Sequence, residues 1–246
     1  MKISSSTVPA NHLLAMLPLQ FKPAFMESCE HVDLNFTQVL SEPGDRIRYV
    51  YFPLDSFISL VTKLADGSRL EVGIVGNEGL LGASLILGVN TSWQHALVQG
   101  AGSALRISAT AFDRHCKHSI ALRLWLSRYV YVLMGQLALT AACTHYHVVE
   151  ERLARWLLVT RDRAHSNQFH LTHEMLSLML GVRRVGITQA ATALHKRGLI
   201  NYSRGEIDIC DGNGLEQAAC RCYREAREMY EQTLGSTRKV REKAPQ

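Results

Sequence analysis

The sequence predicts an α+β chain in which an antiparallel β-sandwich or jelly roll comes first, a long helix follows, and a small helical domain with a β-hairpin ends the fold. Three observations lead to this prediction. Turn signals recur about every ten residues between Val32 and Ile107, as is typical of sandwiches and barrels. An apolar segment runs from about Ser119 to His147. Two short helical segments meet at Gly181, and two strands follow over residues 200–209.

The length of 246 residues suits two domains, each able to bury its own core. Hydrophobic residues make up 47% of the chain, and no Pro, Gly, Ser or Gln tract interrupts it, so a soluble, globular fold is expected. We place a β domain at residues 1–117, a connecting helix at 118–147, a second domain at 148–234 and a disordered basic tail at 235–246.

The β domain is divided by clusters of turn-forming residues. These fall at residues 41–44, 53–56, 65–68, 76–79 and 100–103. Ile58–Thr62 and Leu70–Val75 flank the dipeptide Asp66-Gly67, which favours a tight turn, so these two segments are expected to form a hairpin. A short helical segment near Phe112 follows the last strand.

The connecting helix has no polar face and needs cover on several sides. Packing one side on its own β domain and another on a second copy of the chain would provide that cover, which predicts a homodimer. Leu124–Cys143 also resembles a membrane span, but Arg128 and Gln136 interrupt it, and the uninterrupted part is shorter than the roughly 20 residues that a bilayer requires. We therefore expect a buried helix and no membrane partner.

Charge is distributed unevenly along the chain. Residues 1–150 hold 11 basic and 11 acidic side chains, whereas residues 151–246 hold 16 and 11. This basic excess favours a polyanionic partner for the second domain, although similar excesses occur on proteins that never bind nucleic acid. The six cysteines are scattered, which is typical of reduced thiols, and Pro18 breaks the short apolar stretch near the N-terminus, so a cytoplasmic protein is expected.

The second domain begins with a helix over residues 150–161 and a loop at 165–168. Two short helices then meet at Gly181, where a turn with positive φ is least costly for glycine. Residues 200–209 form a hairpin that would act as a wing, and a single last helix is predicted from Leu215 to about Leu234. The arrangement predicts a winged helix-turn-helix, whose crossing helices would be held by Leu176, Leu180, Val182, Ile187 and Ala190.

The start of the second of these helices carries side chains that could enter the major groove of double-stranded DNA. Arginine pairs bidentately with guanine and glutamine with adenine, and each good pair contributes roughly 1 to 3 kcal/mol of discrimination. The turn of the hairpin adds a basic side chain that could contact a phosphate. Two consecutive arginines are also common on ordinary surfaces, so the inference depends on the whole arrangement. The candidate DNA-binding residues are Arg183, Arg184, Val185, Thr188, Gln189 and Arg204.

Nearly the whole chain resembles the Crp/Fnr family of bacterial transcription regulators. The similar segments are Val149–Leu157, Leu180–Arg184 and Tyr51–Pro53. The resemblance implies a cyclic-nucleotide-binding-like sensor domain that responds to an effector, and a dimer with its recognition helices about 34 Å apart on a palindromic site. It also implies that RNA polymerase is a partner.

The resemblance further implies which residues contact DNA. A phosphate contact at the start of the first helix falls on Thr172, and base contacts fall on Arg184, Val185 and Gln189. The best-known members of the family carry Glu and Arg where this chain has Val185 and Gln189. The target sequence of this chain should therefore differ from theirs.

The sensor domain departs from the cyclic-nucleotide pattern. Gly76-Asn77-Glu78-Gly79 resembles the turn that holds the nucleotide, but the Arg-Ser/Thr pair that binds the cyclic phosphate aligns with Gln94-His95. Glutamine lacks the charge and the two-point geometry of a guanidinium, and histidine is positive only when protonated. We expect no standard cAMP or cGMP binding, an effector of unknown identity, and candidate pocket residues Gly76, Glu78, Gln94 and His95.

No cofactor and no metal site are predicted. A Cys-ligated iron–sulfur cluster requires clustered N-terminal cysteines, and only Cys29 lies there. Histidines and cysteines at residues 115–118 and 143–147 could suggest a metal or haem. However, His145 and His147 stand two apart on a helix and face different ways. The spacing of Cys143 and His147 is better, but no metal is expected there either.

Two other functions remain open. A cupin-like metal-dependent enzyme would need His and carboxylate ligands on its strands, and there is no histidine between Leu34 and Val89. The chain also lacks a G-x-S-x-G nucleophile motif, so we do not expect an enzyme. A cyclic-nucleotide-binding module with no role at DNA is the other alternative, and the helix-turn-helix arrangement argues against it.

Overall fold

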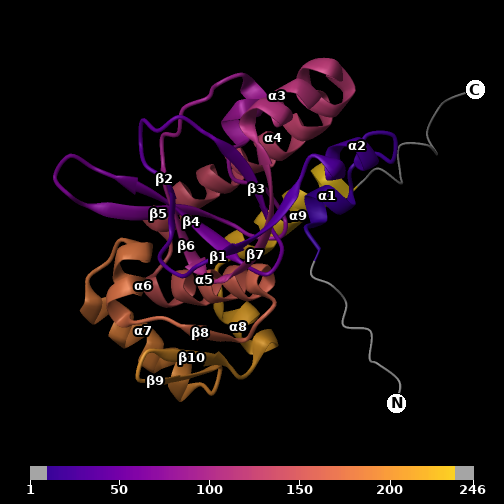
Figure 1. Cartoon of the computed structure of the whole chain (residues 1–246). Coiled ribbons are helices and arrows are strands. Elements are labelled where there is room, and N and C mark those ends of the chain that lie inside the picture. Colours follow the sequence, from indigo (N-terminus) through magenta and orange to yellow (C-terminus); the bar gives the residue numbers. More distant parts are fainter. Residues whose placement is uncertain (1–9, 236–246) are drawn as a thin grey trace, which may run out of the picture.

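A computed structural model describes residues 10–235, which form a β domain, a long helix and a winged-helix domain (Figure 1). The predicted disordered tail lies outside the described residues, except for Gly235. The β domain begins with two short helices, α1 (His12–Ala15) and α2 (Lys22–Glu27). Its strands are β1 (Glu30–Leu34), β2 (Val39–Ser41), β3 (Tyr49–Pro53), β4 (Phe57–Lys63), β5 (Arg69–Val75), β6 (His95–Gly100) and β7 (Gly102–Ser108), with the 3₁₀ helix η1 (Ala83–Leu87) between β5 and β6.

Two antiparallel sheets make up the β domain, and the predicted sandwich is confirmed. One sheet has the order β1-β7-β3, and the other has the order β2-β6-β4-β5. Strands β4 and β5 pair as the predicted hairpin, with Ile58 opposite Val75 and Thr62 opposite Leu70. Buried aliphatic side chains such as Ile58 and Val98 fill the space between the sheets.

The connecting helix α4 (Ile120–Tyr146) follows α3 (Ala109–His118). It begins where the Ser119 hydroxyl accepts the N–H of Leu122, and it ends at His147, whose backbone is extended. One side of α4, including Trp125 and Tyr129, is buried against the β domain. Among the described residues, no helix combines the length and apolarity needed to cross a bilayer.

The winged-helix domain comprises five helices and a small sheet with the order β8-β10-β9. Strand β8 was not predicted and includes the end of the expected loop, because three residues are too few to show a strand period. Its middle residue, Phe169, is buried opposite Ile207. The elements are α5 (Val149–Ala164), β8 (Gln168–His170), α6 (His173–Leu180), α7 (Arg184–Lys196), β9 (Ile200–Ser203), β10 (Glu206–Ile209), α8 (Gly212–Ala218) and α9 (Cys222–Leu234).

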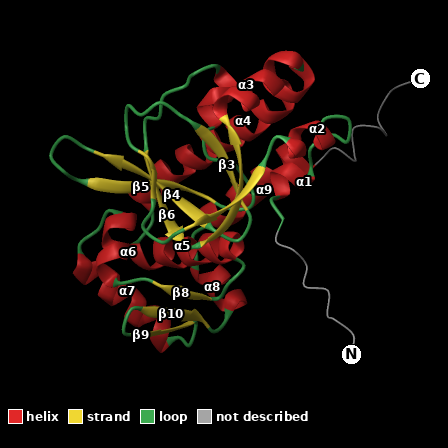
Figure 2. Cartoon of the chain, in the orientation of Figure 1, coloured by secondary structure: helices red, strands yellow, loops and turns green. Residues whose placement is uncertain are grey.

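The prediction of one last helix from Leu215 to Leu234 is wrong. Asp211 caps α8 by accepting the N–H of Gly214, and the chain then leaves the helical conformation at Ala219 (φ −76°, ψ 150°). The break lets α8 pack on α5 while α9 turns away and packs along α4, which one straight helix could not do. Figure 2 shows α9 extending from the winged-helix domain toward α1.

A buried polar contact joins the two domains between β5 and α5. The Glu71 carboxylate accepts the indole N–H of Trp156 at 2.6 Å and the hydroxyl of Ser59 at 2.5 Å. Burial raises the pKa of Glu71 to about 7, although both hydrogen bonds and the charges of Arg163 and Arg155 lower it. Glu71 is therefore a proton-binding group inside the interface between the domains.

Candidate DNA interface and effector cavity

Helices α6 and α7 meet at a tight turn that glycine makes possible. Gly181 ends α6 with φ +62°, and the N–H of Val182 bonds to the carbonyl of Ser177. Thr172 caps α6, since its hydroxyl accepts the N–H of Met175. The cap uses the hydroxyl only as an acceptor, so its O–H, together with the backbone N–H groups at this helix start, could face a phosphate.

The same turn rests on the β domain, which gives a test of the packing. A Cβ added at Gly181 would lie 2.7 Å from Cδ1 of Leu70, whereas one added at Gly198 (φ +70°) would meet nothing within 4 Å. Both Gly181→Ala and Gly198→Ala should lose about 1 kcal/mol of unfolding free energy to the left-handed backbone, and Gly181→Ala should lose more because Leu70 must move. Urea unfolding measures both. Equal losses would mean that the turn is free of the β domain in solution.

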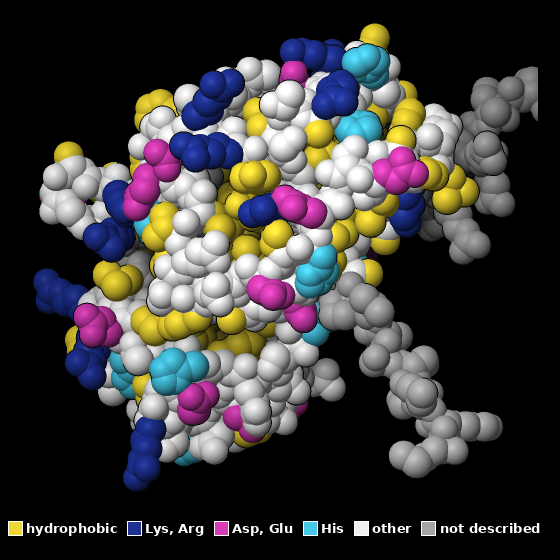
Figure 3. Space-filling view, in the orientation of Figure 1, with side chains coloured by type: hydrophobic (Ala, Val, Ile, Leu, Met, Phe, Trp, Pro, Cys, Tyr) yellow, Lys and Arg dark blue, Asp and Glu magenta, His cyan; other side chains and the backbone are white. Residues whose placement is uncertain are grey.

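One face of α7 is exposed and carries the predicted reading residues. Ile187, Ala190, Ala191 and Leu194 are buried in the domain core, which leaves the opposite face free. Val185 is 61% exposed although it is a large apolar side chain. Lys and Arg side chains project from the edge of the molecule where α6 and α7 lie (Figure 3). The exposed face includes Arg184, Val185, Thr188 and Gln189, with Arg183 exposed at the N-cap.

Contacts within the domain restrict two of the side chains on this face. The Thr188 hydroxyl lies 3.1 Å from the carbonyl of Arg184 and 3.0 Å from Nδ1 of His173. The His173 ring is stacked on Tyr202 of the wing, and burial together with the Arg184 charge lowers the pKa of His173. Thr188 therefore connects α7 to α6 through its hydroxyl and leaves its methyl group for an apolar contact with a base.

The wing places Arg204 at an unusual backbone position. Arg204 (φ +51°) and Gly205 (φ +86°) are both left-handed, as in the two-residue turns that favour Asn or Gly at the first position. A non-glycine residue in this conformation costs roughly 1 kcal/mol of folding free energy, and such strained residues cluster at functional sites. The Arg204 side chain, a predicted phosphate contact, is exposed at the tip of the hairpin.

Two exposed residues of α7 were missing from the predicted set. Thr192 and Lys196 follow Gln189 by three and seven positions and so lie on the same face. A short second helix was predicted, whereas α7 has 13 residues. The helical spacing would have identified both residues had the length been known.

A cavity of about 520 Å³ opens between the sheets and α4. Arg46 and Arg48 bring two positive charges to it, and Asp45 brings one negative charge. Gln94 is the one predicted pocket residue among those that line it. Val130 and Leu133 of α4 form part of its wall, so a ligand there would touch the connecting helix directly. The cavity is also lined by Ser41, Tyr49, Tyr51, Ser84, Ser92 and Trp93.

The other three predicted pocket residues lie elsewhere. Glu78 forms a largely buried ion pair with Arg163 of α5 at 3.0 Å, and its other oxygen accepts the N–H of Gly76. A Cβ at Gly76 would lie 2.4 Å from Cβ of Arg163, so this glycine permits α5 to approach. His95 is buried with Nδ1 2.9 Å from a carboxylate oxygen of Glu42. The predicted set thus splits between the cavity, the domain interface and a strand.

Within the part of the chain that the structure describes, one group of side chains could hold a metal ion. It consists of Cys143, His147, Cys220 and Cys222, whose ligand atoms all lie within 4.8 Å of one another. The sequence pattern paired only Cys143 with His147, and no metal was predicted there. Cys220 and Cys222 were not predicted to join them, because they fall within the single predicted helix from Leu215 to Leu234, and the structure has no such helix.

The comparisons with known proteins agree with this geometry. Residues 151–218 match the family model described as the Crp-like helix-turn-helix domain. No curated protein matches the chain. Many solved structures match the chain. The three described below are less than 20% identical to it, so they show a shared fold but do not show a shared role.

FixK2 from Bradyrhizobium japonicum has a TM-score of 0.66 and 14% identity, and the match covers 78% of this chain and 98% of that one. A putative transcriptional regulator of the Crp/Fnr family from Eubacterium rectale has a TM-score of 0.65 and 16% identity, with 84% and 96% covered. The c-di-GMP-responsive global regulator CLP from Xanthomonas campestris has a TM-score of 0.62 and 15% identity, with 78% and 99% covered. The predicted fold class is confirmed.

Proposed function

The chain carries a Crp-like helix-turn-helix domain and has the fold of the Crp/Fnr regulators, and on that basis we propose that it is a transcription regulator that binds a palindromic DNA site as a homodimer. The observation that carries the proposal is the exposed face of α7, which begins with two arginines at the helix N-terminus. A helix that begins with basic side chains and has an exposed polar face can enter a major groove and contact the edges of the bases there.

An apolar stripe on α4 supports the dimer. Ile120, Leu124, Tyr131 and Met134 are each more than 60% exposed, although α4 is otherwise packed against the β domain and α9. With Ser127, Ala138 and Ala141 they follow the alternating spacing of four and three residues that a pair of helices buries. We call these seven residues the α4 stripe. Two copies joined along it would present two α7 helices to one duplex.

Control by a small effector is the second part of the proposal. The cavity between the sheets touches Val130 and Leu133, and the α4 stripe lies on another side of the same helix. A ligand that shifts α4 would change how the two copies pair and hence how far apart the α7 helices stand. The cavity's Arg46 and Arg48 favour an anionic effector, bound without the arginine–phosphate pair of cyclic-nucleotide sensors. RNA polymerase would be the further partner at a promoter.

Selection of random duplex DNA by the purified protein tests the proposed function. We expect a palindrome whose half-sites are about one helical turn apart, with an affinity that falls steeply with salt. A selected site without twofold symmetry would contradict the dimeric arrangement. Binding that is salt-sensitive but blind to sequence, with and without cell extract as a source of effector, would contradict base reading by α7.

Arg184 and Arg204 should respond differently to removal. Arg184→Ala is expected to relax the preference at one base pair per half-site by roughly 1 to 3 kcal/mol, because a bidentate contact to guanine is lost. Arg204→Ala should weaken binding to all sequences alike and reduce the slope of affinity against salt, as loss of a phosphate contact does. Binding curves on the selected site and its single-base variants measure both effects.

Arg114 provides the charge-matched control, because it is exposed on α3 and lies outside the winged-helix domain. Arg114→Ala should change neither the base preference nor the salt slope. Uniform weakening by Arg184→Ala would make that side chain a phosphate contact instead of a base contact.

A further inference from the structure

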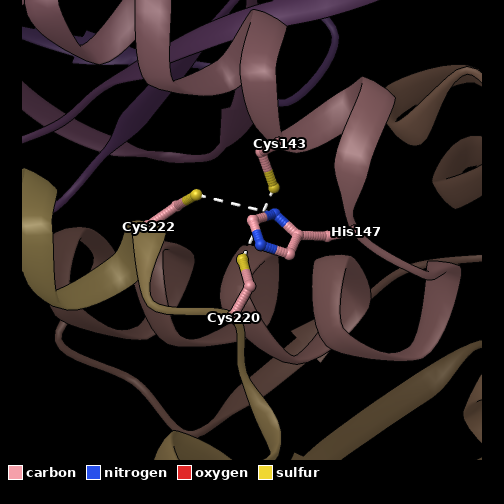
Figure 4. A group of neighbouring side chains, drawn as sticks. All are labelled: Cys143, His147, Cys220 and Cys222. Atoms are coloured by element: carbon pink, nitrogen blue, oxygen red, sulfur yellow. Dashed lines mark hydrogen bonds between the residues drawn. The ribbon is translucent and has the colours of Figure 1, made fainter.

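Three cysteines and a histidine from two distant parts of the chain point toward one another where α4 ends and α9 begins (Figure 4). Cys143 lies in the last turn of α4, and His147 caps that helix. Cys220 and Cys222 flank Arg221 at the break between α8 and α9. All three thiols belong to residues less than 7% exposed, and His147 is half-buried. These four residues are called the Cys₃His cluster below.

Two distances within the Cys₃His cluster match those of a single-ion site, and all four ligand atoms lie within 4.8 Å of one another. The Sγ atoms of Cys143 and Cys220 lie 3.5 Å apart, and Sγ of Cys222 lies 3.7 Å from Nδ1 of His147. Zinc bonds of about 2.3 Å to sulfur and about 2.0 Å to nitrogen, arranged tetrahedrally, place ligand atoms about 3.5 to 3.8 Å apart. A disulfide would need the two sulfur atoms about 2.05 Å apart. An iron–sulfide cluster would hold its thiolates farther apart than one ion does.

The electrostatic surroundings favour thiolates. The positive charge of Arg155 on α5 acts on all three thiols of the cluster. Three thiolates and a neutral imidazole around Zn²⁺ carry a net charge of −1, which the Arg155 guanidinium would offset.

We propose that the Cys₃His cluster binds one zinc ion, which fastens the start of α9 to the end of α4. Soft thiolate ligands with one imidazole in a closed, tetrahedral and buried arrangement are the donor set of structural zinc sites. Because all four positions are protein ligands, the ion has no open position for substrate. The site lies outside the effector cavity and outside the DNA-binding face of α7.

The position of the ion gives it a role in how the winged-helix domain is held. Between α4 and α5 the chain continues through His147 and Val148 alone, so the relative orientation of the two helices depends on contacts made elsewhere. The ion would add a second connection, from the end of α4 to the start of α9. The consequence for DNA rests on the proposed function: loss of zinc should lower affinity for the palindromic site, because the two α7 helices are no longer held at a fixed spacing.

Metal content measured on the full-length reduced protein, purified without a polyhistidine tag, tests the proposal directly. We expect about one zinc per chain, and after removal by a chelator at low pH we expect uptake of about one Zn²⁺ with release of protons. Titration with Co²⁺ should give the visible absorption of a tetrahedral thiolate site. None of these readouts involves DNA, so they separate failure of the zinc site from failure of the proposed function.

Ligand variants locate the ion. Cys220→Ser and His147→Ala should each hold below about 0.1 zinc per chain and show a lower unfolding midpoint, since the free energy of metal binding contributes to folding. Cys210→Ser and His118→Ala are matched controls, because both residues are exposed and outside the cluster, and both should retain full zinc. His147→Ala removes only a half-buried side chain, so it keeps the test valid if the cysteine variants do not fold.

Three results would overturn the proposal. The first is a reduced wild-type protein that contains no zinc and takes up none when titrated. The second is zinc content unchanged in both ligand variants. The third is a disulfide between Cys143 and Cys220 in protein kept reduced throughout purification, which would leave the cluster without the thiolates that zinc requires.

Discussion

Replacing Met134 with glutamate is expected to convert the protein to a monomer and to lower its affinity for a palindromic site by at least about 100-fold. Met134 is the residue of the α4 stripe that follows its central residue, Tyr131, and it is 63% exposed in a single chain. In a twofold dimer whose two α4 helices run parallel, the two copies of residue 134 face each other, so the variant would bury two like charges without partners. Each monomer would then bind one half-site without the gain from joining the two.

Sedimentation measures the oligomeric state, and binding to the full and half palindromes measures the affinity. Met134→Leu is the matched control and should stay dimeric, because it keeps an apolar side chain of similar volume. If Met134→Glu remained a dimer, the interface would lie elsewhere on the chain. If it became a monomer with unchanged affinity, DNA binding would not depend on joining two half-sites.

Replacing Glu71 with glutamine is expected to stabilise the protein above neutral pH. The pKa of Glu71 is raised from 4.5 to about 7, so between these values the folded protein keeps a proton that the unfolded chain has lost. The contribution of Glu71 to the free energy of unfolding is therefore largest below pH 4.5. It falls as the pH rises to about 7 and stays low above that value. The difference for a fully buried carboxyl corresponds to about 3 kcal/mol.

Denaturant unfolding of the wild type and Glu71→Gln between pH 5 and pH 8 measures this effect. The variant should lose most of the decline over that range, since an amide can still accept from Trp156 and pair with Ser59 without carrying a charge. Glu228→Gln, on the exposed side of α9, should retain the decline. Equal pH profiles for wild type and Glu71→Gln would show that Glu71 is ionised in the folded protein at pH 5.

The fold was largely predictable because its main elements have strong local patterns. The β4–β5 hairpin followed from alternating apolar residues around Asp66-Gly67, and α4 followed from a long apolar segment without proline, in which Gly135 does not interrupt the helix. The turn at Gly181 was predictable because glycine there satisfies a left-handed backbone. In each case local sequence and tertiary structure favour the same conformation.

The candidate sites were harder to predict because tertiary contacts decide them. The nucleotide-binding pattern grouped Glu78 with Gln94, but the charge of Arg163, 85 positions after Glu78 in the chain, draws Glu78 into the domain interface. The Cys₃His cluster depends on the break at Ala219, where a helical pattern continues on both sides without proline or glycine. The break lets α8 pack on α5 while α9 packs on α4, and no local signal marks it.

Helix α9 belongs to two hydrophobic cores at once. Tyr223, near its start, is buried in the core of the winged-helix domain, and Leu234, at its end, is buried with Leu13 and Phe25 in the core of the β domain. The Tyr230 hydroxyl also donates to the carbonyl of Glu78. Separating the two domains would therefore expose part of both cores, so heat should unfold the chain in one cooperative transition, and a fragment that begins at residue 148 should not fold with α9 in place.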